Sequence, residues 1–310
     1  MSCRVAVLGA GGFVGAAVVS RLESRGHTVA AVRAPRLRQG SPATAADLVE
    51  AAGNIDTTEL AAAFSGCDAV VNAAGDPDAS STDSETLLGA NALLPAVALA
   101  AAQRAGVPRF VHVSSAVVQG DIAVLDDSAE VRPFSAYSTS KVLGEQVLEQ
   151  LGRAGELVIF RPPSVHGPDR RVTRRIAGFA RSPLTSVARP GTQPSPQALV
   201  DNIGDAVAWL ATEGSPPLRV TYPWEGLTTE SLLRHLSGRS PRRIPRGPAR
   251  FVLRVAGITV GRLPVGAANL RRLEILWFGQ GQAQSWLTTQ GWQPPVGTHG
   301  WDALIRRTGS

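Results

Sequence analysis

The chain has 310 residues, of which 44% are hydrophobic and 18% charged, and its formal net charge is +6. This composition can build a sizeable core and carries too little charge for a disordered polyelectrolyte. The basic residues are scattered and do not alternate with aromatic residues in one stripe. The charge therefore argues against nucleic acid as a partner and suits a small anionic molecule.

Cysteine usage and apolar runs indicate a cytoplasmic protein with neither a metal site nor a membrane partner. Cys3 and Cys67 form no CxxC pair and no Cys/His cluster. Regularly spaced glycines in the first apolar run, residues 5–19, argue against a signal sequence, and no other run reaches 18 apolar residues. The segment 251–266, FVLRVAGITVGRLPVG, predicts an amphipathic helix that packs on the protein or lines a cleft rather than lying on a membrane.

Short apolar runs alternate with helical patterns over the first 160 residues. Continuous apolar strands separated by helices are typical of a parallel sheet covered on both faces, and right-handed crossovers then give a Rossmann-like, doubly wound α/β fold. The predicted strands are 4–8, 28–33, 68–72, 109–114 and 157–161, with a weaker one in 47–53, and the predicted helices are 12–24, 57–64, 84–105 and 135–153.

The character of the sequence changes after Arg161, where prolines become dense. A helix at 199–211, a short strand at 219–222 and three later helical stretches are predicted there. We expect residues 1–161 to form the Rossmann-like domain and residues 162–310 to form mainly a smaller C-terminal lobe, with some elements returning to the first domain.

A glycine-rich turn joins the first strand to the first helix. It consists of Gly9, Ala10, Gly11, Gly12, Phe13, Val14 and Gly15. Gly9 permits the tight turn, Gly12 lets backbone N–H groups approach a pyrophosphate, and Gly15 lets the helix pack closely on the sheet. Its position after the first strand predicts that the turn binds a dinucleotide.

The end of the second strand bears on the choice of cofactor. An acidic residue there binds the ribose 2′-hydroxyl of NAD, but here the strand ends in Arg33, with Arg36 and Arg38 after it. A guanidinium pairs with a 2′-phosphate, so Arg33 favours NADP(H) over NAD(H). The alternative is an ordinary solvated arginine.

Further motifs occur in order with the glycine turn. They are Asn72-Ala73-Ala74-Gly75, Ser114-Ser115, Tyr137-x-x-x-Lys141, the segment 160–168 (FRPPSVHGP) and the segment 291–294 (GWQP). Together they resemble the extended branch of the short-chain dehydrogenase/reductase superfamily, which includes sugar-nucleotide epimerases, dehydratases and reductases. The resemblance covers nearly the whole chain and implies an NAD(P)-binding first domain and a substrate-binding lobe.

The resemblance implies that Ser115, Tyr137 and Lys141 are catalytic. Tyr137 and Lys141 face the same way on a helix because they are four residues apart. A fixed ammonium favours the phenolate and lowers the pKa of a tyrosine, which is otherwise about 10. Tyr137 would exchange the proton, Ser115 would hold the substrate oxygen, and Lys141 would also contact the nicotinamide ribose.

The same resemblance implies further contacts. The cofactor-binding set is Gly9, Gly11, Gly12, Phe13, Val14, Gly15, Arg33, Asn54, Ile55, Ala73, Ala74, Gly75, Asn91, Tyr137, Lys141, Pro162 and Val165, and the substrate set is Ser115, Val117 and His166. Asn54 and Ile55 belong to GNID, which is similar to the family's adenine-contacting GDLxD. His166 stands where the family has tyrosine, and it either contacts substrate or is a packed, hydrogen-bonded histidine.

Departures from the family pattern narrow the function. Dehydratases carry an acidic pair after the serine, but this chain has Ala116 and Val117, which cannot exchange a proton. Asp126 and Asp127 are expected in a solvated loop. Dehydratase activity is therefore not expected. The favoured function is an NADP(H)-dependent oxidoreductase that acts on a nucleotide-activated sugar or a related metabolite.

Two other functions stay open. One is an epimerase that retains its cofactor, and the other is a non-catalytic NADP-binding regulator, which the retained Tyr137 and Lys141 disfavour. A homodimer formed through two helices is common in this family.

Overall fold

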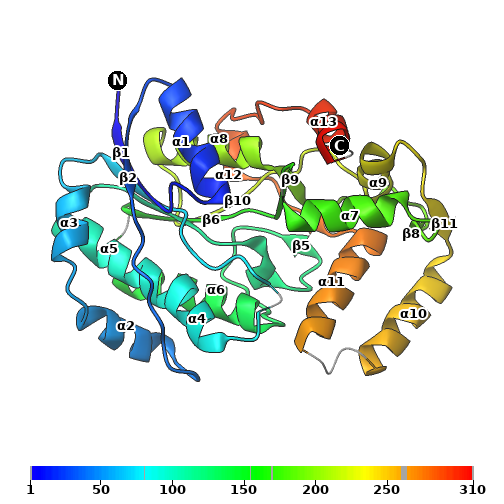
Figure 1. Cartoon of the computed structure of the whole chain (residues 1–310), viewed down its shortest axis with the longest axis horizontal. Helices are drawn as coiled ribbons and strands as arrows, with labels where there is room; N and C mark the ends of the chain where they lie inside the picture. Colours follow the sequence, from blue (N-terminus) through cyan, green and yellow to red (C-terminus); the bar gives the residue numbers. More distant parts are fainter. Residues whose placement is uncertain (1, 80, 154, 169, 260–263, 309–310) are drawn as a thin grey trace.

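A six-stranded parallel sheet forms the centre of the computed structural model, which describes all residues except 1, 80, 154, 169, 260–263 and 309–310 (Figure 1). The strand order is β10-β6-β4-β3-β1-β2. The bounds are β1 Arg4–Leu8, β2 Thr28–Val32, β3 Ala69–Asn72, β4 Phe110–Val113, β6 Leu157–Arg161 and β10 Arg219–Thr221. The predicted doubly wound sheet is confirmed, and each of these strands lies within a residue of its predicted ends.

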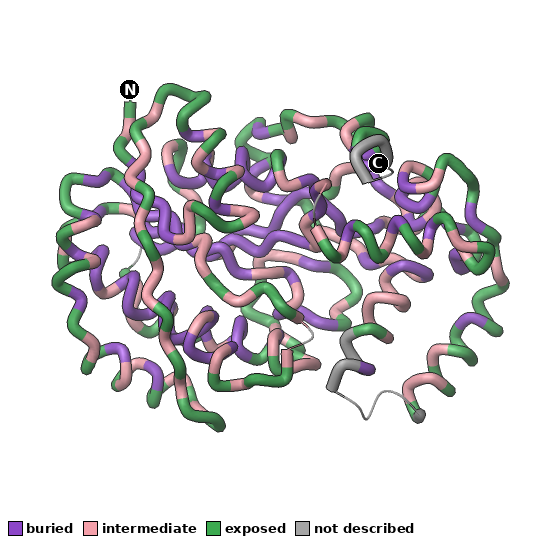
Figure 2. Tube along the Cα trace, viewed as in Figure 1, coloured by how far each residue is buried: buried purple, intermediate pink, exposed green. Residues whose placement is uncertain are grey.

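Helices cover both faces of the sheet, as the continuous apolar strands predict. Along β1, Val5 and Val7 pack with α1 and α8, whereas Ala6 and Leu8 pack with α3 and α5 on the opposite face. Figure 2 shows this buried centre between the two helical layers. The bounds are α1 Phe13–Ser24, α3 Thr58–Phe64, α5 Leu94–Arg104, α6 Ala136–Leu151, α8 Val200–Thr212 and α12 Trp286–Thr289.

The weak strand expected at residues 47–53 is wrong: these residues belong to helix α2, Ala45–Gly53. Thr44 starts the helix, because its side chain accepts from the N–H of Asp47 while the Asp47 carboxylate accepts from the N–H of Thr44. Leu48 and Ala52 of α2 pack on Val97 of α5, and Val147 of α6 joins the same cluster. The segment that was predicted as a strand is therefore a helix, and it packs on other helices and not in the sheet.

Among the described residues one helical stretch, Ser84–Arg104, is long and apolar enough to cross a membrane, but 78% of its apolar 18-residue window is buried inside the protein. It consists of α4 Ser84–Leu88, a π-helical turn at Gly89–Leu93 and α5. We therefore regard it as the core helix predicted at 84–105.

The second half of the chain contributes to both regions. Helices α8 and α12 and strand β10 complete the central domain, and α7, α9, α11 and α13 pack in the lobe around Trp301, which is fully buried. Small parallel pairs join β7 to β9, β8 to β11 and β5 to β12. The remaining bounds are β5 Val124–Leu125, β7 Ser164–His166, β8 Ser186–Ala188, β9 Gln197–Leu199, β11 Arg242–Ile244, β12 Gly281–Gln282, α7 Arg171–Arg181, α9 Thr229–Ser237, α10 Arg246–Thr259, α11 Pro264–Phe278 and α13 His299–Thr308.

The single helix predicted at 251–266 is also corrected. Residues 251–259 lie in α10 and Pro264 begins α11, while 260–263 lie outside the described residues. A proline is well suited to the first turn of a helix because its missing N–H is not needed there.

Candidate active site

The glycine turn is shaped as the sequence predicts. Gly9 adopts φ +84°, and its carbonyl accepts from the N–H of Gly12 at 2.9 Å. A Cβ on Gly15 would collide with the Gly9 carbonyl, so only glycine allows α1 to approach this closely. Gly12 caps α1 without a side-chain hydrogen bond. The turn fits a dinucleotide, because the first-turn N–H groups of α1, from Phe13 and Val14 onward, are left for a phosphate.

The arginines after β2 differ in their surroundings. Arg38 is held by Asp83 at 3.5 Å and Glu85 at 3.1 Å. Arg33 and Arg36 are exposed, and within the described part of the chain neither has an ion-pair partner. Arg33 is therefore free to meet an anionic group of a ligand, whereas Arg38 is engaged.

Ser115, Tyr137 and Lys141 converge at the carboxyl end of the sheet. Ser115 follows β4, and its side chain lies close enough to that of Tyr137, in the first turn of α6, to lower the pKa of the phenol. Ser135 starts α6 through a reciprocal pair of hydrogen bonds with Ser138, which fixes the turn that carries Tyr137. The predicted catalytic side chains are thus brought together, and Lys141 lies one turn further along α6.

Electrostatics act differently on the two titrating groups. Burial lowers the pKa of Lys141 to about 8, against the opposing effect of Glu145 and Asp76. Burial raises the pKa of Tyr137, while the Ser115 hydrogen bond and the charges of Arg170 and Arg272 lower it. Lys141 stays protonated at neutral pH, so its ammonium, 3.4 Å from the Val113 carbonyl, supplies positive charge beside the site.

The predicted cofactor segment Ala73–Ala74–Gly75 lies beside this lysine. A Cβ on Gly75 would come within 2.7 Å of Asn91 Oδ1 and 3.4 Å of Lys141 Nζ. The Asn91 amide accepts from the N–H of Asp76 at 3.0 Å and donates to Ser140 Oγ at 3.1 Å. Asn91 is fully buried, so it positions the segment against α6.

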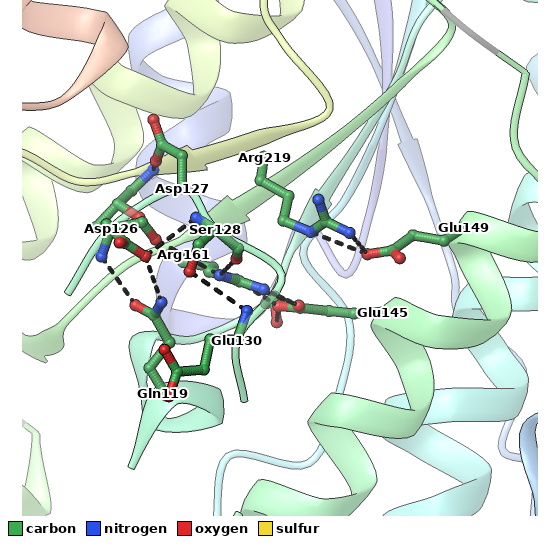
Figure 3. A network of polar contacts seen from close by, with 11 residues as sticks. Gln119, Asp126, Asp127, Ser128, Glu130, Glu145, Glu149, Arg161 and Arg219 are labelled. Atoms are coloured by element: carbon green, nitrogen blue, oxygen red, sulfur yellow. Dashed lines mark hydrogen bonds and ion pairs between the residues drawn. The ribbon is translucent and has the colours of Figure 1, made fainter. Parts of the chain in front are cut away.

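A buried ion pair that sequence reasoning missed lies beside α6 and stabilises it (Figure 3). The Glu145 carboxylate pairs with Arg161 at 2.6 Å, and both side chains are at most 3% exposed. Ser114 donates to Glu145 at 2.5 Å, so this serine serves the network and leaves Ser115 for the site. Glu145 follows Lys141 by four residues, a spacing that could have pointed to it.

The same network engages the loop of Asp126 and Asp127, which the sequence analysis expected to be solvated. Arg161 donates to the Ser128 carbonyl at 2.7 Å, and Asp126 accepts from Gln119 at 2.8 Å. The Asp127 carboxylate accepts from the N–H of Thr221 at 2.5 Å, and burial raises its pKa. The expectation is wrong: this loop is tied to β10.

The lobe meets the glycine turn through Phe13. A Cβ on Gly167 would come within 2.8 Å of the Phe13 ring, and the Arg170 guanidinium lies 4.7 Å from the centre of that ring. Pro162 is buried and its carbonyl accepts from the N–H of Ala116 at 2.8 Å, which links it to the Ser115 turn. Val165 is partly buried in the core under α1 and α8.

His166 has surroundings that disagree with a substrate contact. It is fully buried, its Nε2 lies 2.6 Å from Gln197 Oε1, and its Nδ1 lies 3.1 Å from Thr173 Oγ1. Burial lowers its pKa to about 4, and its ring contacts that of Trp301 at 5.2 Å. The structure supports the packed, hydrogen-bonded alternative and corrects the substrate assignment.

The other expected contacts have mixed outcomes. Val117 is partly exposed on the turn after Ser115, so a substrate contact there stays a prediction. Asn54 is the exposed cap of α2, and Ile55 packs in the cluster beneath that helix. The adenine assignment for both rests on the resemblance of GNID to the family's motif, and it stays a prediction.

Two arginines of the lobe lie near the site, although they belong to no motif and were not predicted from the sequence. Arg170 precedes α7 and Arg272 lies on α11, and the positive charges of both act on Tyr137. Burial lowers the pKa of each guanidinium. The surroundings of Tyr137 therefore contain two partly desolvated positive charges as well as the negative charge of Asp76.

A family model shared by known proteins fits this arrangement. The model of the NAD dependent epimerase/dehydratase family matches residues 5–224. The chain belongs to this family. The resemblance found in the sequence motifs is confirmed, and the matched span runs from β1 to just past β10.

Curated relatives include both reductases and epimerases. A 4-hydroxy-2-methyl-3-oxo-4-farnesyl-3,4-dihydroquinoline-1-oxide ketoreductase from Stigmatella aurantiaca is 34% identical over 174 residues, which cover 54% of this chain and 51% of the relative. An ADP-L-glycero-D-manno-heptose-6-epimerase from Thiobacillus denitrificans is 28% identical over 188 residues, which cover 58% and 56%. The matches thus span about half of the length of these relatives.

Among solved structures, MoeE5 in complex with UDP-glucose and NAD has a TM-score of 0.63 and 20% identity, with 99% of this chain and 100% of that chain covered. At this identity the likeness shows the fold alone, the lobe included.

Proposed function

We propose that the protein is an NADP(H)-dependent oxidoreductase that reduces a carbonyl group of a small anionic molecule, or oxidises the matching alcohol. The observation that carries the proposal is the convergence of Ser115, Tyr137 and Lys141 beside an uncapped glycine turn. Family membership and a ketoreductase relative support it.

In the direction of reduction, Ser115 and Tyr137 bind the substrate oxygen through their hydroxyl groups, which lie close to each other. Bound nicotinamide would supply the hydride to the carbonyl carbon. The Tyr137 hydroxyl gives its proton to the oxygen as negative charge develops there, and the Lys141 ammonium stabilises the phenolate that remains. In the direction of oxidation the same groups act in reverse.

Arg33 supports NADP(H), because it is exposed at the end of β2 and has no partner in the described chain. The residues expected to hold the cofactor in this orientation are the turn Gly9–Gly15, the segment Ala73–Gly75 and Lys141.

The two arginines beside Tyr137 support an anionic substrate. Arg170 and Arg272 hold two desolvated positive charges beside Tyr137, and phosphate is a good partner for such guanidinium groups. A nucleotide-activated sugar with a keto group has this chemistry.

An epimerase that keeps its cofactor is the second candidate, and the relative from Thiobacillus denitrificans favours it. Ala116 and Val117 replace the acidic pair that water elimination needs, so dehydration is not proposed.

Tyr137→Phe tests the proposal, and Tyr222→Phe is a control because the chain has only these two tyrosines. Turnover of keto sugar nucleotides and ring ketones is followed through absorbance of the reduced nicotinamide. We expect Tyr137→Phe to lose about a thousandfold in kcat and to keep its affinity for cofactor. Tyr222 bonds to Glu225 away from the site, so its variant keeps its turnover. Full activity of Tyr137→Phe refutes the mechanism.

The state of the purified protein separates the two candidates. An oxidoreductase exchanges its cofactor, so dialysed protein contains none and requires added NADPH for turnover. A nicotinamide that stays bound through dialysis, together with turnover that needs no added cofactor, supports the epimerase.

A further inference from the structure

Helix α10 carries an apolar face that is largely exposed. Phe251 is 68% exposed, Val255 43% and Ile258 63%, and Val252 beside them is 49% exposed. The first three are spaced i, i+4 and i+7, so they share one side of the helix. Half of the eight large hydrophobic side chains exposed in the described chain lie on this helix, which makes them a patch rather than scattered surface residues.

The opposite face holds α10 on the protein. Ala249 is fully buried and Leu253 packs with it against Trp277 of α11. The stripe of Phe251, Val255 and Ile258 therefore points away from the lobe, and Figure 2 shows α10 at the edge of the molecule with little buried surface.

Positive charge lies along one side of this stripe. Arg246, Arg250 and Arg254 follow one flank of α10, and all three are exposed. Ten arginines and no acidic residue occur from Ser231 to Leu273. Because the whole chain carries +6, the rest of the protein carries a net −4. The positive charge, which the sequence analysis treated as scattered, is therefore concentrated in this part of the lobe.

The same three arginines line a hollow of about 410 Å³ between α10 and α11, with Leu253, Leu270 and Phe278 as its apolar lining. Arg246 and Arg250 lie over the Phe278 ring, at 5.5 and 5.7 Å from its centre. The acid that borders the hollow, Glu274, is engaged by Arg271 at 2.6 Å. The guanidinium groups are thus left for anions from outside.

We propose that α10 docks the protein on the surface of a bilayer that contains anionic phospholipid. Phe251, Val255 and Ile258 enter the boundary of the acyl chains, and the flanking arginines contact the phosphates of the headgroups. Two copies joined through this face would bring their acid-free basic segments together, which disfavours self-association. The helix packs on the protein through Ala249 and Leu253, as the sequence predicts, and the proposal adds a membrane contact that the sequence analysis argued against. It is independent of the proposed reaction.

Flotation with lipid vesicles tests the proposal. The purified chain is mixed with vesicles of phosphatidylcholine alone, or of phosphatidylcholine with an equal share of phosphatidylglycerol. We expect binding to the anionic vesicles, roughly tenfold less binding to the neutral ones, and weakening as salt rises. Phe251→Ser with Ile258→Ser should lower binding to anionic vesicles by roughly tenfold or more, and Arg250→Gln with Arg254→Gln should lower it several-fold.

Controls change matched groups elsewhere. Leu218→Ser alters an exposed apolar side chain beside β10, and Arg153→Gln removes an exposed charge after α6. Both should bind vesicles as the wild type does, and gel filtration and cofactor binding should be the same for all variants. Absence of wild-type binding to anionic vesicles overturns the proposal. So does unchanged binding of the Phe251/Ile258 variant, or a wild-type dimer that this variant dissociates without any vesicle binding.

Discussion

Arg161 and Arg254 show how differently the two regions of this protein use the same side chain. Arg161, at the end of β6, is 1% exposed, pairs with Glu145 and donates to a backbone carbonyl beside the catalytic helix. Arg254, on α10, is exposed beside an apolar stripe. In the central domain polar groups hold one another, which fixes the geometry of the reaction. On α10, in the lobe, the arginines face outward and are open to solvent.

The largest expected effect concerns the held arginine. Arg161→Leu leaves the Glu145 carboxylate buried without its partner, so the free energy of unfolding should fall by about 3–5 kcal/mol. Arg254→Leu should change it by less than about 0.5 kcal/mol. Urea unfolding measures both. Equal effects of the two substitutions would contradict the contrast between the regions. The double variant Glu145→Leu with Arg161→Leu should recover part of the free energy of unfolding that Arg161→Leu loses.

A buried group of the lobe gives the next effect. The His166 pKa of about 4 lies below its unfolded value of about 6.5, so the unfolded chain binds more protons between these pH values. The free energy of unfolding should therefore fall by about 3 kcal/mol as pH drops from 6.5 to 4. His166→Gln should weaken this dependence in urea titrations without abolishing it, because burial also lowers the pKa of His112. His299→Gln, at an exposed position, is the control. Parallel curves for all three proteins would contradict the assignment.

A substitution of Lys141 tests whether the active site of the central domain depends on the size and shape of the cation at this position. Lys141→Arg keeps the charge but places a larger planar group in a buried site, so kcat should fall by about a hundredfold. Because the wild-type pKa is about 8, activity should decline as pH rises through that value, and the arginine variant should lose this alkaline limb. A variant within threefold of the wild type would show that any cation suffices.

The smallest effect concerns an exposed arginine in the central domain. Arg33→Asp should lower the ratio of kcat/KM for NADPH to that for NADH by roughly tenfold or more, because an acid repels a 2′-phosphate. Arg38→Asp is the matched control, since Arg38 is already engaged by Asp83 and Glu85. An unchanged ratio for Arg33→Asp would leave the cofactor preference without support from this residue.

The strands were predictable because parallel strands buried on both faces are continuous apolar runs, and the glycine turn and Tyr137/Lys141 because their chemistry needs fixed local spacing. Residues 47–53 were misassigned because a run so short does not distinguish strand from helix. Arg272 could not be found, because it reaches Tyr137 only through the fold. His166 kept two interpretations until its burial was known.

Helix α2 has a practical consequence for anyone who edits this protein. The connection between β2 and α3 could be mistaken for a loop that tolerates shortening. Without α2, however, Leu93, Val97 and Val147 would face water as one apolar area, whereas Asp47 and Glu50 now present a polar exterior there. The segment covers an apolar surface of the domain, and its removal would replace a polar surface by an apolar one that promotes aggregation.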